Sequence, residues 1–465
     1  MSAAPVDRFA PFADKMRDAG LPAIAVDCFR YYFERYLRGD TGTVPESSIT
    51  PLEDVADATE LARYRDAGRR AVERAVVVKL NGGLGTSMGL SAAKSLLPAK
   101  DGLSFLDIIV RQVLHLRRVY GCPLPLVLMN SFRTRADSQK VLARYPELAG
   151  ELPADFLQHK VPRITKDAGA PAAWPGNPEH EWCPPGHGDL YPALVSSGLL
   201  DALLARGMRW AFVSNSDNLG AVLDVDILGW IASEEIPFVM EVADRSEADK
   251  KGGHLARDRA GRLLLRESAQ CRKEDEAVFQ DVLRHRYFNT NNLWIDLEVL
   301  ARVLRERGGI LGLPMITNEK PVDPDDPASP RVVQLETAMG AAIAVFEGAR
   351  AVRVARDRLV PVKTTSDLLV LWSDAYELAA DFRVVASPRR TEPDLVVDLD
   401  PKYYRQVADL QARFPEGAPS LVRCRRFVVR GDVRFGGGAV VEGDVRVVHD
   451  GPEQRVVPAG TVLQG

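Results

Sequence analysis

Four glycines stand within eight residues directly after the apolar run 75–78, in the segment KLNGGLGTSMG, residues 79–89. Glycine loses more backbone freedom on folding than other residues, so such a cluster needs a reason. A glycine-rich turn between a strand and a helix exposes consecutive N–H groups and lets a phosphate approach closely. The segment therefore predicts a phosphate-binding loop, although a tight turn alone would explain one or two of the glycines.

Two common types of phosphate loop do not fit this segment. A Walker-type loop ends in Gly-Lys-Ser/Thr, whereas Gly85 is followed by Thr86. A dinucleotide-binding loop has the pattern G-x-G-x-x-G, and the spacing that starts from Gly83 is one residue too long. Lys94 follows the loop and could place a positive charge beside a polyphosphate. A solvated lysine is the simpler alternative.

Further segments carry residues suited to binding metal, phosphate or sugar. Asp217 follows the strand-like run WAFVSN, and a carboxylate at the carboxyl end of a strand can hold a magnesium ion against phosphate oxygens. In PPGHGD, His187 lies between glycines, and Asp189 is expected to cap a helix that ends at Gly207. The amides of FNTNNLW, residues 288–294, could bind sugar hydroxyls. Ordinary turn residues would explain each of these segments alone.

Taken together, the segments resemble those of UTP–glucose-1-phosphate uridylyltransferases, the UDP-glucose pyrophosphorylases. LNGGLGTSMG followed by a lysine is similar to the signature of this family. The similarity spans about residues 76–372 and continues, in the family's order, through LMNSFRTRADS, FLQHKVPRI, PPGHGDLYPAL, FVSNSDNLGA, KGG, RESAQC, FNTNNLW, QLETAMGAAI and LVPVKTTSDLLVL. One departure is LSAA, residues 90–93, where the family usually has Cys-Lys-Gly-Pro. Without that proline, the backbone before Lys94 is less rigid.

The resemblance implies roles for individual residues. The implied nucleotide-binding residues are Leu80, Asn81, Gly82, Gly83, Gly85, Thr86, Lys94, Gln158, Gly186, Asp217 and Lys363. The implied sugar-phosphate-binding residues are His187, Asn215, Ser216, Asp217, Glu267 and Asn292, and Glu336 resembles another pocket position. Lys94 and Lys363 would be the catalytic charges, Asp217 the Mg²⁺ ligand, and Gln158 would lie near the uracil.

The implied reaction transfers the uridylyl group of UTP to glucose 1-phosphate, with Mg²⁺ as the cofactor, and releases pyrophosphate. Two alternatives remain at this point. The chain could use another sugar 1-phosphate, of the galactose or N-acetylglucosamine type. It could also be a non-catalytic protein that binds sugar nucleotides, although the complete set of Lys94, Asp217 and Lys363 argues against lost activity.

The elements that must position these residues alternate between strand and helix patterns. Short apolar runs such as PLVLMN and IPFVMEV alternate with helix-like stretches such as SFLDIIVRQVLHLRRVYG. This alternation predicts βαβ units in an α/β fold with helices on both faces of a mostly parallel sheet. The resemblance implies a Rossmann-like nucleotidyltransferase fold of the GT-A-like type, with a mixed sheet. Two proline-rich stretches, 167–179 and 320–331, are expected to be long surface loops.

A different pattern begins near the C-terminus. VVRGDVR at residues 428–434 recurs as VVEGDVR at residues 440–446, a spacing of twelve residues or two hexapeptides. Such a repeat predicts a small left-handed parallel β-helix, although chance or a hairpin could also produce two copies. We therefore expect a helical segment over 1–70, a catalytic domain over 71–385 and a β-helix domain over 386–465, which could mediate homo-oligomer formation.

Composition excludes several classes of protein. The 60 Lys and Arg against 64 Asp and Glu give a formal net charge of −4, too balanced for a dedicated nucleic-acid-binding protein. Neither a signal peptide nor an apolar run long enough to cross a membrane is visible. The five cysteines are scattered, which is typical of reduced thiols. We expect a soluble cytoplasmic enzyme.

Overall fold

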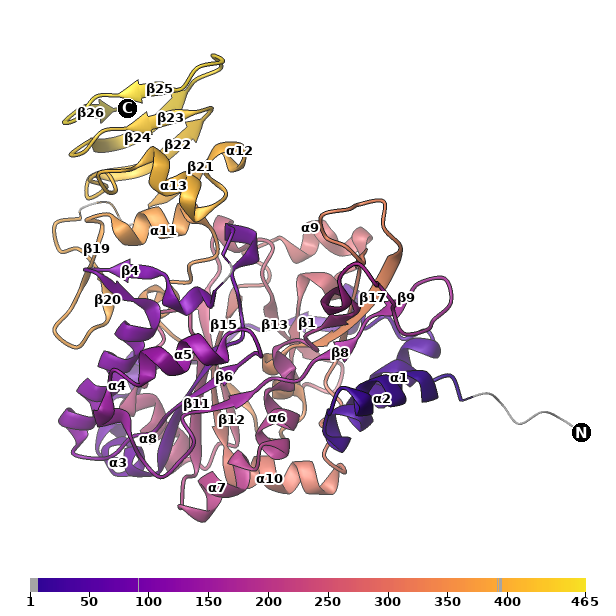
Figure 1. Ribbon diagram of the computed structural model, residues 1–465. Coiled ribbons are helices and arrows are strands. Elements are labelled where there is room, and N and C mark those ends of the chain that lie inside the picture. Colours follow the sequence, from indigo (N-terminus) through magenta and orange to yellow (C-terminus); the bar gives the residue numbers. More distant parts are fainter. Residues whose placement is uncertain (1–6, 91, 391, 393–394) are drawn as a thin grey trace, which may run out of the picture.

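A mixed sheet forms the centre of the computed structural model, which describes residues 7–90, 92–390, 392 and 395–465 (Figure 1). Its strands are, in spatial order, β2 (Ala56–Asp57), β18 (Arg350–Arg353), β12 (Phe238–Asp244), β15 (Tyr287–Asp296), β11 (Trp210–Asn215), β3 (Ala75–Asn81), β6 (Leu126–Asn130) and β7 (Asp155–Leu157). β15 runs antiparallel to both of its neighbours, and the other neighbours along this path are parallel. The prediction of a mixed α/β sheet is confirmed.

Side chains of β3 alternate between two apolar cores. Ala75 and Val77 pack into one cluster, whereas Val76, Val78 and Leu80 pack into the other. The first core also contains residues of α3 (Arg65–Ala71), α4 (Phe105–Tyr120) and α8 (Val225–Ser233), and the second contains residues of α6 (Leu190–Ser196), α7 (Leu199–Ala205) and α10 (Leu297–Glu306). Helices therefore cover both faces, which explains why residues 75–78 of β3 are continuously apolar rather than alternating.

The remaining elements lie around this central sheet. α5 (Arg135–Leu142) follows β6, and β13 (His254–Asp258) pairs with β1 (Ile49–Pro51), β14 (Leu263–Arg266) and β15. Further short elements are α9 (Glu276–Phe279), α11 (Thr365–Trp372), α12 (Pro401–Tyr404), α13 (Val407–Arg413), β4 (Pro98–Lys100), β5 (Leu103–Ser104), β19 (Tyr376–Leu378) and β20 (Val384–Ala386). Within the described ranges, no helix combines the length and the apolar character needed to cross a bilayer.

The helix expected between Asp189 and Gly207 is two helices. α6 ends at Ser196, and α7 begins at Leu199 after Gly198, whose φ of 71° lies in the left-handed region. A left-handed residue cannot continue an α-helix, so the chain turns there. Asp189 also makes no side-chain cap, because its carboxylate accepts hydrogen bonds from His159 instead.

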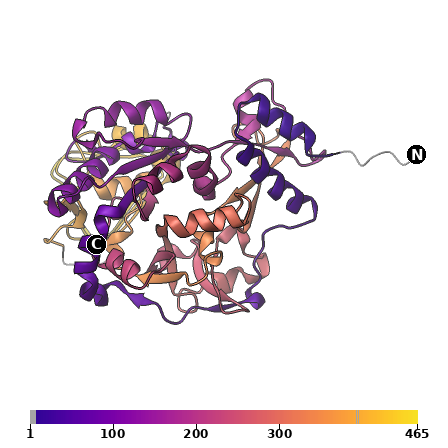
Figure 2. The same ribbon diagram turned by 90° about the horizontal axis from the view of Figure 1, so that it is seen from below.

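The N-terminal segment is not wholly helical. α1 (Ala10–Asp18) and α2 (Ala23–Leu37) pack against β8 (Val161–Pro162), β10 (Trp182–Cys183), β16 (Met315–Pro321) and β17 (Arg331–Thr337), on one side of the molecule (Figure 2). β1 and β2, however, join the central sheet. Residues 1–70, which we expected to form a helical segment, therefore also contribute two strands to the body of the protein.

The two proline-rich loops lie against each other beside a small sheet. β17 pairs with β16 and with β9 (Ile164–Thr165). Arg163 Nη1 donates to Val322 O at 2.7 Å, and Ala172, Val322 and Val332 share a small apolar cluster. Ala172 and Val322 in this cluster bring the 167–179 and 320–331 loops together.

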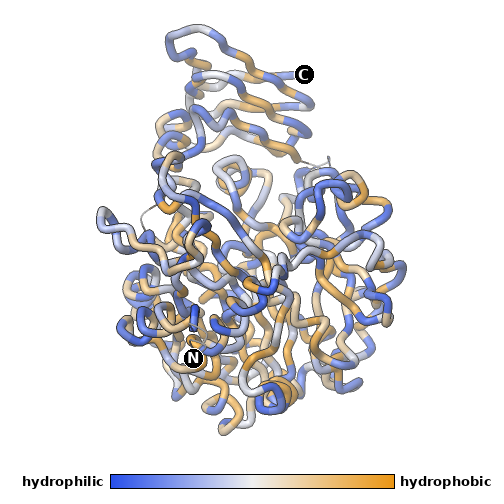
Figure 3. Tube along the Cα trace, turned by 90° about the vertical axis from the view of Figure 1, so that its right-hand side faces the viewer, coloured by the Kyte–Doolittle hydropathy of each residue, from blue (hydrophilic) through white to orange (hydrophobic). Residues whose placement is uncertain are grey.

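The C-terminal strands pair in parallel, as the β-helix prediction requires. β21 (Val396–Leu399), β22 (Cys424–Arg430), β24 (Val440–Val448) and β26 (Val462–Gln464) form one sheet, and β23 (Val433–Phe435) and β25 (Arg455–Val457) form another. Apolar residues recur in successive strands (Figure 3). Phe427 lies beside Val445 and Val433 lies beside Arg455. In these two pairs the stacked residues are 18 and 22 positions apart, so residues twelve positions apart, such as Val433 of β23 and Val445 of β24, do not stack on each other.

Candidate active site

Four parallel strands end at the same edge of the central sheet. Gly82, Ser131, Gln158 and Ser216 are the first residues after β3, β6, β7 and β11. Because α/β sheets bind ligands at the carboxyl ends of their parallel strands, a ligand site is expected at this edge. Ser216 N donates to Leu80 O at 3.0 Å, which joins the segment before Asp217 to the start of the glycine loop.

The glycine loop allows two close approaches. A Cβ on Gly82 would lie 2.7 Å from Gln158 Oε1, and a Cβ on Gly85 would contact Leu90 and the stem of Lys94. Gly85 and Gly89 have φ of 65° and 75°, so glycine is needed there for the backbone as well. Short 3₁₀ turns at Thr86–Met88 and Lys94–Leu96 separate the loop from α4, which begins at Phe105 in the expected helix-like stretch. The N–H donors for a phosphate would therefore come from the loop itself.

Lys94 and Asp217 form an ion pair beside the glycine loop. Lys94 Nζ lies 2.8 Å from Asp217 Oδ2, and their side chains are 15% and 24% exposed. Lys94 N also donates to Gly83 O at 3.1 Å, which fixes the lysine against the loop. The structure thus brings together a glycine loop, a cation and a carboxylate, the groups that a triphosphate with a divalent ion requires.

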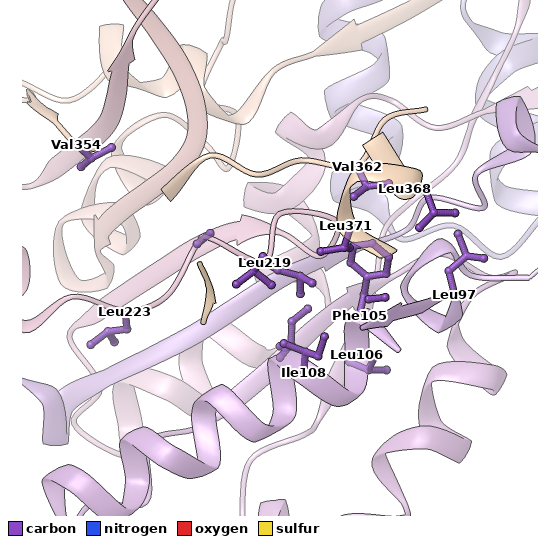
Figure 4. Close-up of a cluster of buried hydrophobic side chains, with 14 of the residues drawn as sticks. Leu97, Phe105, Leu106, Ile108, Leu219, Leu223, Val354, Val362, Leu368 and Leu371 are labelled. Carbon is purple, nitrogen blue, oxygen red and sulfur yellow. The ribbon is translucent and has the colours of Figure 1, made fainter. Parts of the chain in front are cut away.

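The segment that carries Lys363 is attached to Asp217. Val362 N donates to the backbone oxygen of Asp217 at 3.2 Å. Val362 is buried in an apolar cluster with Leu368 of α11, Phe105 of α4 and Leu97, three residues after Lys94 (Figure 4). This cluster anchors the segments of both lysines. Lys363 itself is exposed, and among the described residues no carboxylate lies within ion-pair distance of it.

Gln158, Gly186 and His187 lie together on the other side of the loop. Gln158 Nε2 donates to Gly186 O at 3.0 Å. Gly186 has φ of 79°, and a Cβ there would overlap the backbone of Thr337. His187 Nδ1 accepts from Met339 N at 3.0 Å, and burial lowers the pKa of His187 to about 4. The ring is therefore neutral at pH 7 with its proton on Nε2, which makes Nε2 a hydrogen-bond donor.

The resemblance assigns Glu267 to the sugar phosphate. Burial raises the pKa of Glu267, while a hydrogen bond with Asn289 and the positive charge of Lys363 act in the opposite direction. Gly253 leaves room for this carboxylate, because a Cβ there would lie 2.5 Å from Glu267 Oε2. Glu267, Asn289 and Lys363 are therefore neighbours despite their separation in sequence.

The amide of Asn292 does not face this space. Asn292 is fully buried, and its Nδ2 donates to Glu241 Oε2 at 3.0 Å. Asn291, with φ of 57°, is only partly buried, and its Oδ1 accepts from Asn289 Nδ2 at 2.9 Å. Of the three amides in this part of β15, only that of Asn291 is partly exposed, while Asn289 is buried beside it and Asn292 is committed to Glu241.

Two residues of the implied nucleotide set also point inward. Asn81 is buried, and its Nδ2 donates to Asn130 Oδ1 and Ser138 Oγ, both at 2.7 Å. The side chain of Leu80 packs in the apolar core, so both residues can offer a ligand only backbone groups. Of the remaining predicted residues at this edge, Gly83 and Thr86 are exposed, Asn215 is partly buried and Ser216 is buried. Glu336 is partly buried in β17, outside the central sheet, and lies next to Gly186.

Several supporting residues were not identified from the sequence. Arg358 makes a two-point contact with the buried Glu241, with Nε–Oε2 and Nη2–Oε1 distances of 2.8 and 2.6 Å. Lys79 is 1% exposed and donates to Ser214 Oγ and Ala221 O, each at 2.7 Å, and burial lowers its pKa to about 7. A single charged residue inside VVVKL or FVMEV was the signal that could have flagged Lys79 and Glu241.

A metal ion would fit here only in company with a phosphate ligand. The described residues hold no group of three or more His, Cys, Asp or Glu that could ligate a metal. Asp217 nevertheless offers one partly exposed carboxylate beside the glycine loop. Mg²⁺ typically uses one or two carboxylates together with phosphate oxygens and water, so this single carboxylate matches Mg²⁺ bound with a nucleotide.

Comparison with known proteins agrees with this geometry. A family model described as UTP--glucose-1-phosphate uridylyltransferase matches residues 26–442. The UTP--glucose-1-phosphate uridylyltransferase of Hordeum vulgare is 40% identical over 437 residues, 92% of this chain and 90% of that protein. A crystal structure of a UDP-glucose pyrophosphorylase mutant from Leishmania major in complex with UDP-glucose shares 45% identity, covers 98% of both chains and has a TM-score of 0.92. A Trypanosoma brucei structure shares 42% identity with a TM-score of 0.91, again over 98% of both chains.

Proposed function

Because the chain belongs to the UTP–glucose-1-phosphate uridylyltransferase family and transfers the uridylyl group of UTP to glucose 1-phosphate, we propose which of its residues perform each part of this reaction. A phosphate oxygen of glucose 1-phosphate attacks the α-phosphorus of UTP in line, and pyrophosphate leaves. The phosphate monoester is already a competent nucleophile, so no general base is needed. The residues therefore act by positioning the substrates and by neutralising charge.

The phosphate groups are the part of the substrates that the charged residues hold. Gly82, Gly83 and Gly85 donate backbone N–H groups to the triphosphate, and Lys94 neutralises the departing pyrophosphate. Lys363 approaches from the opposite side and stabilises the two reacting phosphates. Among the described residues no carboxylate lies within ion-pair distance of Lys363, which supports this role, because its ammonium group can then bind an anion.

Asp217 is the residue that would hold Mg²⁺. When bound, the ion supplies positive charge to the phosphate oxygens on which negative charge accumulates. Asp217 also keeps Lys94 beside the loop through their ion pair. Its backbone oxygen accepts from Val362 N, and this bond places Lys363 relative to the same carboxylate.

The uridine and sugar ends of the substrates lie on opposite sides of these charges. Gln158 and Gly186, which are joined by a hydrogen bond, contact the uracil end. The backbone of Gly82 lies directly beside the side chain of Gln158 there. His187 donates from Nε2 to the sugar phosphate, and Asn215, Ser216, Glu267, Asn289 and Asn291 line the sugar side. Asn292 holds this side from within through Glu241.

One observation carries the assignment: the Lys94–Asp217 ion pair lies at the carboxyl edge of the parallel strands, beside the glycine loop. Pyrophosphate release from UTP tests it, with glucose 1-phosphate, galactose 1-phosphate and N-acetylglucosamine 1-phosphate as acceptors and with Mg²⁺ or a chelator present. We expect the fastest release with glucose 1-phosphate and Mg²⁺. Faster release with another sugar would overturn the preference for glucose, and equal release with the chelator would overturn the requirement for Mg²⁺.

Two neighbouring glycines provide a matched test of the nucleotide side. In Gly82→Ala the new Cβ would press on Gln158 Oε1, whereas in Gly83→Ala it would meet nothing within 4 Å. Neither glycine has a positive φ, so alanine is tolerated by the backbone at both positions. We expect Gly82→Ala to raise the KM for UTP about tenfold, which corresponds to about 1.4 kcal/mol, and Gly83→Ala to change it much less. Equal effects of the two substitutions in steady-state kinetics would contradict a role for the Gly82–Gln158 contact.

A further inference from the structure

The side chains of Asp189, His159 and Ser196 form a continuous hydrogen-bonded chain behind the uridine end of the site. Asp189 Oδ2 accepts the backbone N–H of His159 at 2.6 Å, and Asp189 Oδ1 lies 2.9 Å from His159 Nδ1. His159 Nε2 lies 2.9 Å from Ser196 Oγ. None of these three side chains takes part in the reaction as assigned above.

The chemistry of the carboxylate fixes the direction of these bonds. An ionised Asp189 can only accept, so His159 Nδ1 donates to Asp189 Oδ1, and the other ring nitrogen, Nε2, shares a hydrogen bond with the Ser196 hydroxyl. Burial raises the pKa of Asp189, and the hydrogen bonds and charge of His159 act in the opposite direction. Cys28, Phe29 and Tyr32 of α2 line a small cavity next to the pair, so the N-terminal helix shields it from solvent.

Three residues of this type also form the triads of many hydrolases, but this chain lacks the other parts of such a site. Ser196 is the exposed last residue of α6. The N–H groups that follow it are occupied: Ser197 N donates to Ala193 O, and Gly198 N donates to Val195 O. A nucleophilic serine needs free N–H donors that stabilise an oxyanion. The arrangement therefore points to positioning rather than to nucleophilic catalysis.

The hydrogen-bonded pair of His159 and Asp189 lies where it can position the segments of Gln158 and Gly186. Gln158 directly precedes His159, and Gly186 lies three residues before Asp189. Gln158 Nε2 donates to Gly186 O at 3.0 Å, so this bond and the two Asp189–His159 bonds cross-link the same two segments. Gln158 N also donates to Asn130 O at 2.8 Å at the end of β6. The position of Gln158 relative to Gly186 is thus held both by a direct bond and by the buried pair behind it.

We propose that His159 and Asp189 are positioning residues of the uridine pocket, which hold Gln158 against Gly186 at the separation that UTP binding requires. This inference rests on the proposed assignment of Gln158 and Gly186 to the nucleotide. Side chains fixed by packing and by outer hydrogen bonds bind a ligand without first being ordered, which preserves affinity.

Matched substitutions at His159 separate this role from simple stabilisation. An asparagine amide can replace the Nδ1 donor to Asp189, whereas a glutamine amide reaches toward the Nε2 position and leaves Asp189 without its side-chain partner. We expect His159→Gln and Asp189→Asn to raise the Kd of UTP about tenfold, measured by isothermal titration calorimetry on the full chain. His159→Asn should bind UTP within about threefold of the wild type, and Ser196→Ala should bind it like the wild type. The KM for glucose 1-phosphate should change little in all four.

Thermal unfolding of each variant identifies those that fold. A folded His159→Gln or Asp189→Asn variant with wild-type affinity for UTP would overturn the proposal, as would an equal loss of affinity in His159→Asn and His159→Gln. Gln158→Ala separates this inference from the assignment on which it rests. If Gln158→Ala binds UTP normally, the assignment of Gln158 to the nucleotide fails. If it binds UTP weakly while His159→Gln binds normally, only the positioning role fails.

Discussion

Replacing Lys363 with alanine is expected to lower kcat by about 10²–10³-fold, the usual effect of removing one group that stabilises charge in a transition state. The thermal unfolding temperature should stay close to that of the wild type. The side chain is exposed, and the backbone N–H of residue 363, which donates to Asp367 Oδ2 at 2.8 Å, is kept in alanine. Steady-state rates of UDP-glucose formation and a thermal melt of the same preparation measure both quantities.

Lys402 provides the matched control for this experiment. It is another exposed lysine, and it lies on α12 in the C-terminal part of the chain. Lys402→Ala should retain the wild-type kcat, whereas Lys363→Arg should recover part of the lost rate because it restores the charge with a different shape. A wild-type kcat in Lys363→Ala would remove Lys363 from the catalytic set.

Asp217→Asn is expected to have a second large effect, this time on the dependence of the rate on Mg²⁺. The amide keeps the size of the side chain but loses the charge that ligates the cation and pairs with Lys94. We expect kcat/KM to fall by about 10²-fold or more and the Mg²⁺ concentration for half-maximal rate to rise. The bond from Val362 N goes to the backbone oxygen of Asp217, so the segment of Lys363 should stay in place.

The control for Asp217 is Asp357, an exposed carboxylate on the segment that leads to Lys363. Asp357→Asn removes one negative charge from the same part of the protein and should leave the Mg²⁺ dependence unchanged. The initial rate is measured over a range of Mg²⁺ concentrations for the wild type, Asp217→Asn and Asp357→Asn. An unchanged Mg²⁺ requirement in Asp217→Asn would exclude Asp217 as the ligand of the cation.

Local sequence rules predicted the features that depend on strand ends. The glycine cluster after VVVKL and the aspartate after WAFVSN lie at one edge because β3 and β11 are parallel neighbours, and the alternation of strand and helix patterns indicates such a sheet. The same reasoning predicted α4, whose Ser104 and Asp107 form a capping box and whose C-cap Gly121 is left-handed. Features encoded within about twenty residues were therefore accessible from the sequence.

Features that depend on distant partners were not accessible in this way. FNTNNLW contains three asparagines whose amides could each bind a ligand, and the sequence does not distinguish them. The pairing of β15 with β12 shows that the amide of Asn292 is hydrogen-bonded to Glu241 instead. The helix signal of Asp189 was misleading because His159, thirty positions earlier, competes for its carboxylate. The twelve-residue repeat near the C-terminus also concealed the true stacking distance, because two hexapeptides are less than one full turn of the coil.

The proposed set of charges at positions 94, 217 and 363 comes from three segments that lie far apart in the sequence, and two contacts join them: the Lys94–Asp217 ion pair and the hydrogen bond from Val362 N to Asp217 O. During synthesis, the glycine loop and Lys94 leave the ribosome long before Lys363. The segment of Lys363 is then attached to the rest of the site by the hydrogen bond from Val362 N to Asp217 O. Domains of this size commonly fold as units from the N-terminus onward, and contacts between distant residues form late. A nascent chain that lacks the segment around Lys363 therefore cannot assemble the complete set of charges, so catalytic competence should arise only after this segment has been synthesised and has packed against Asp217.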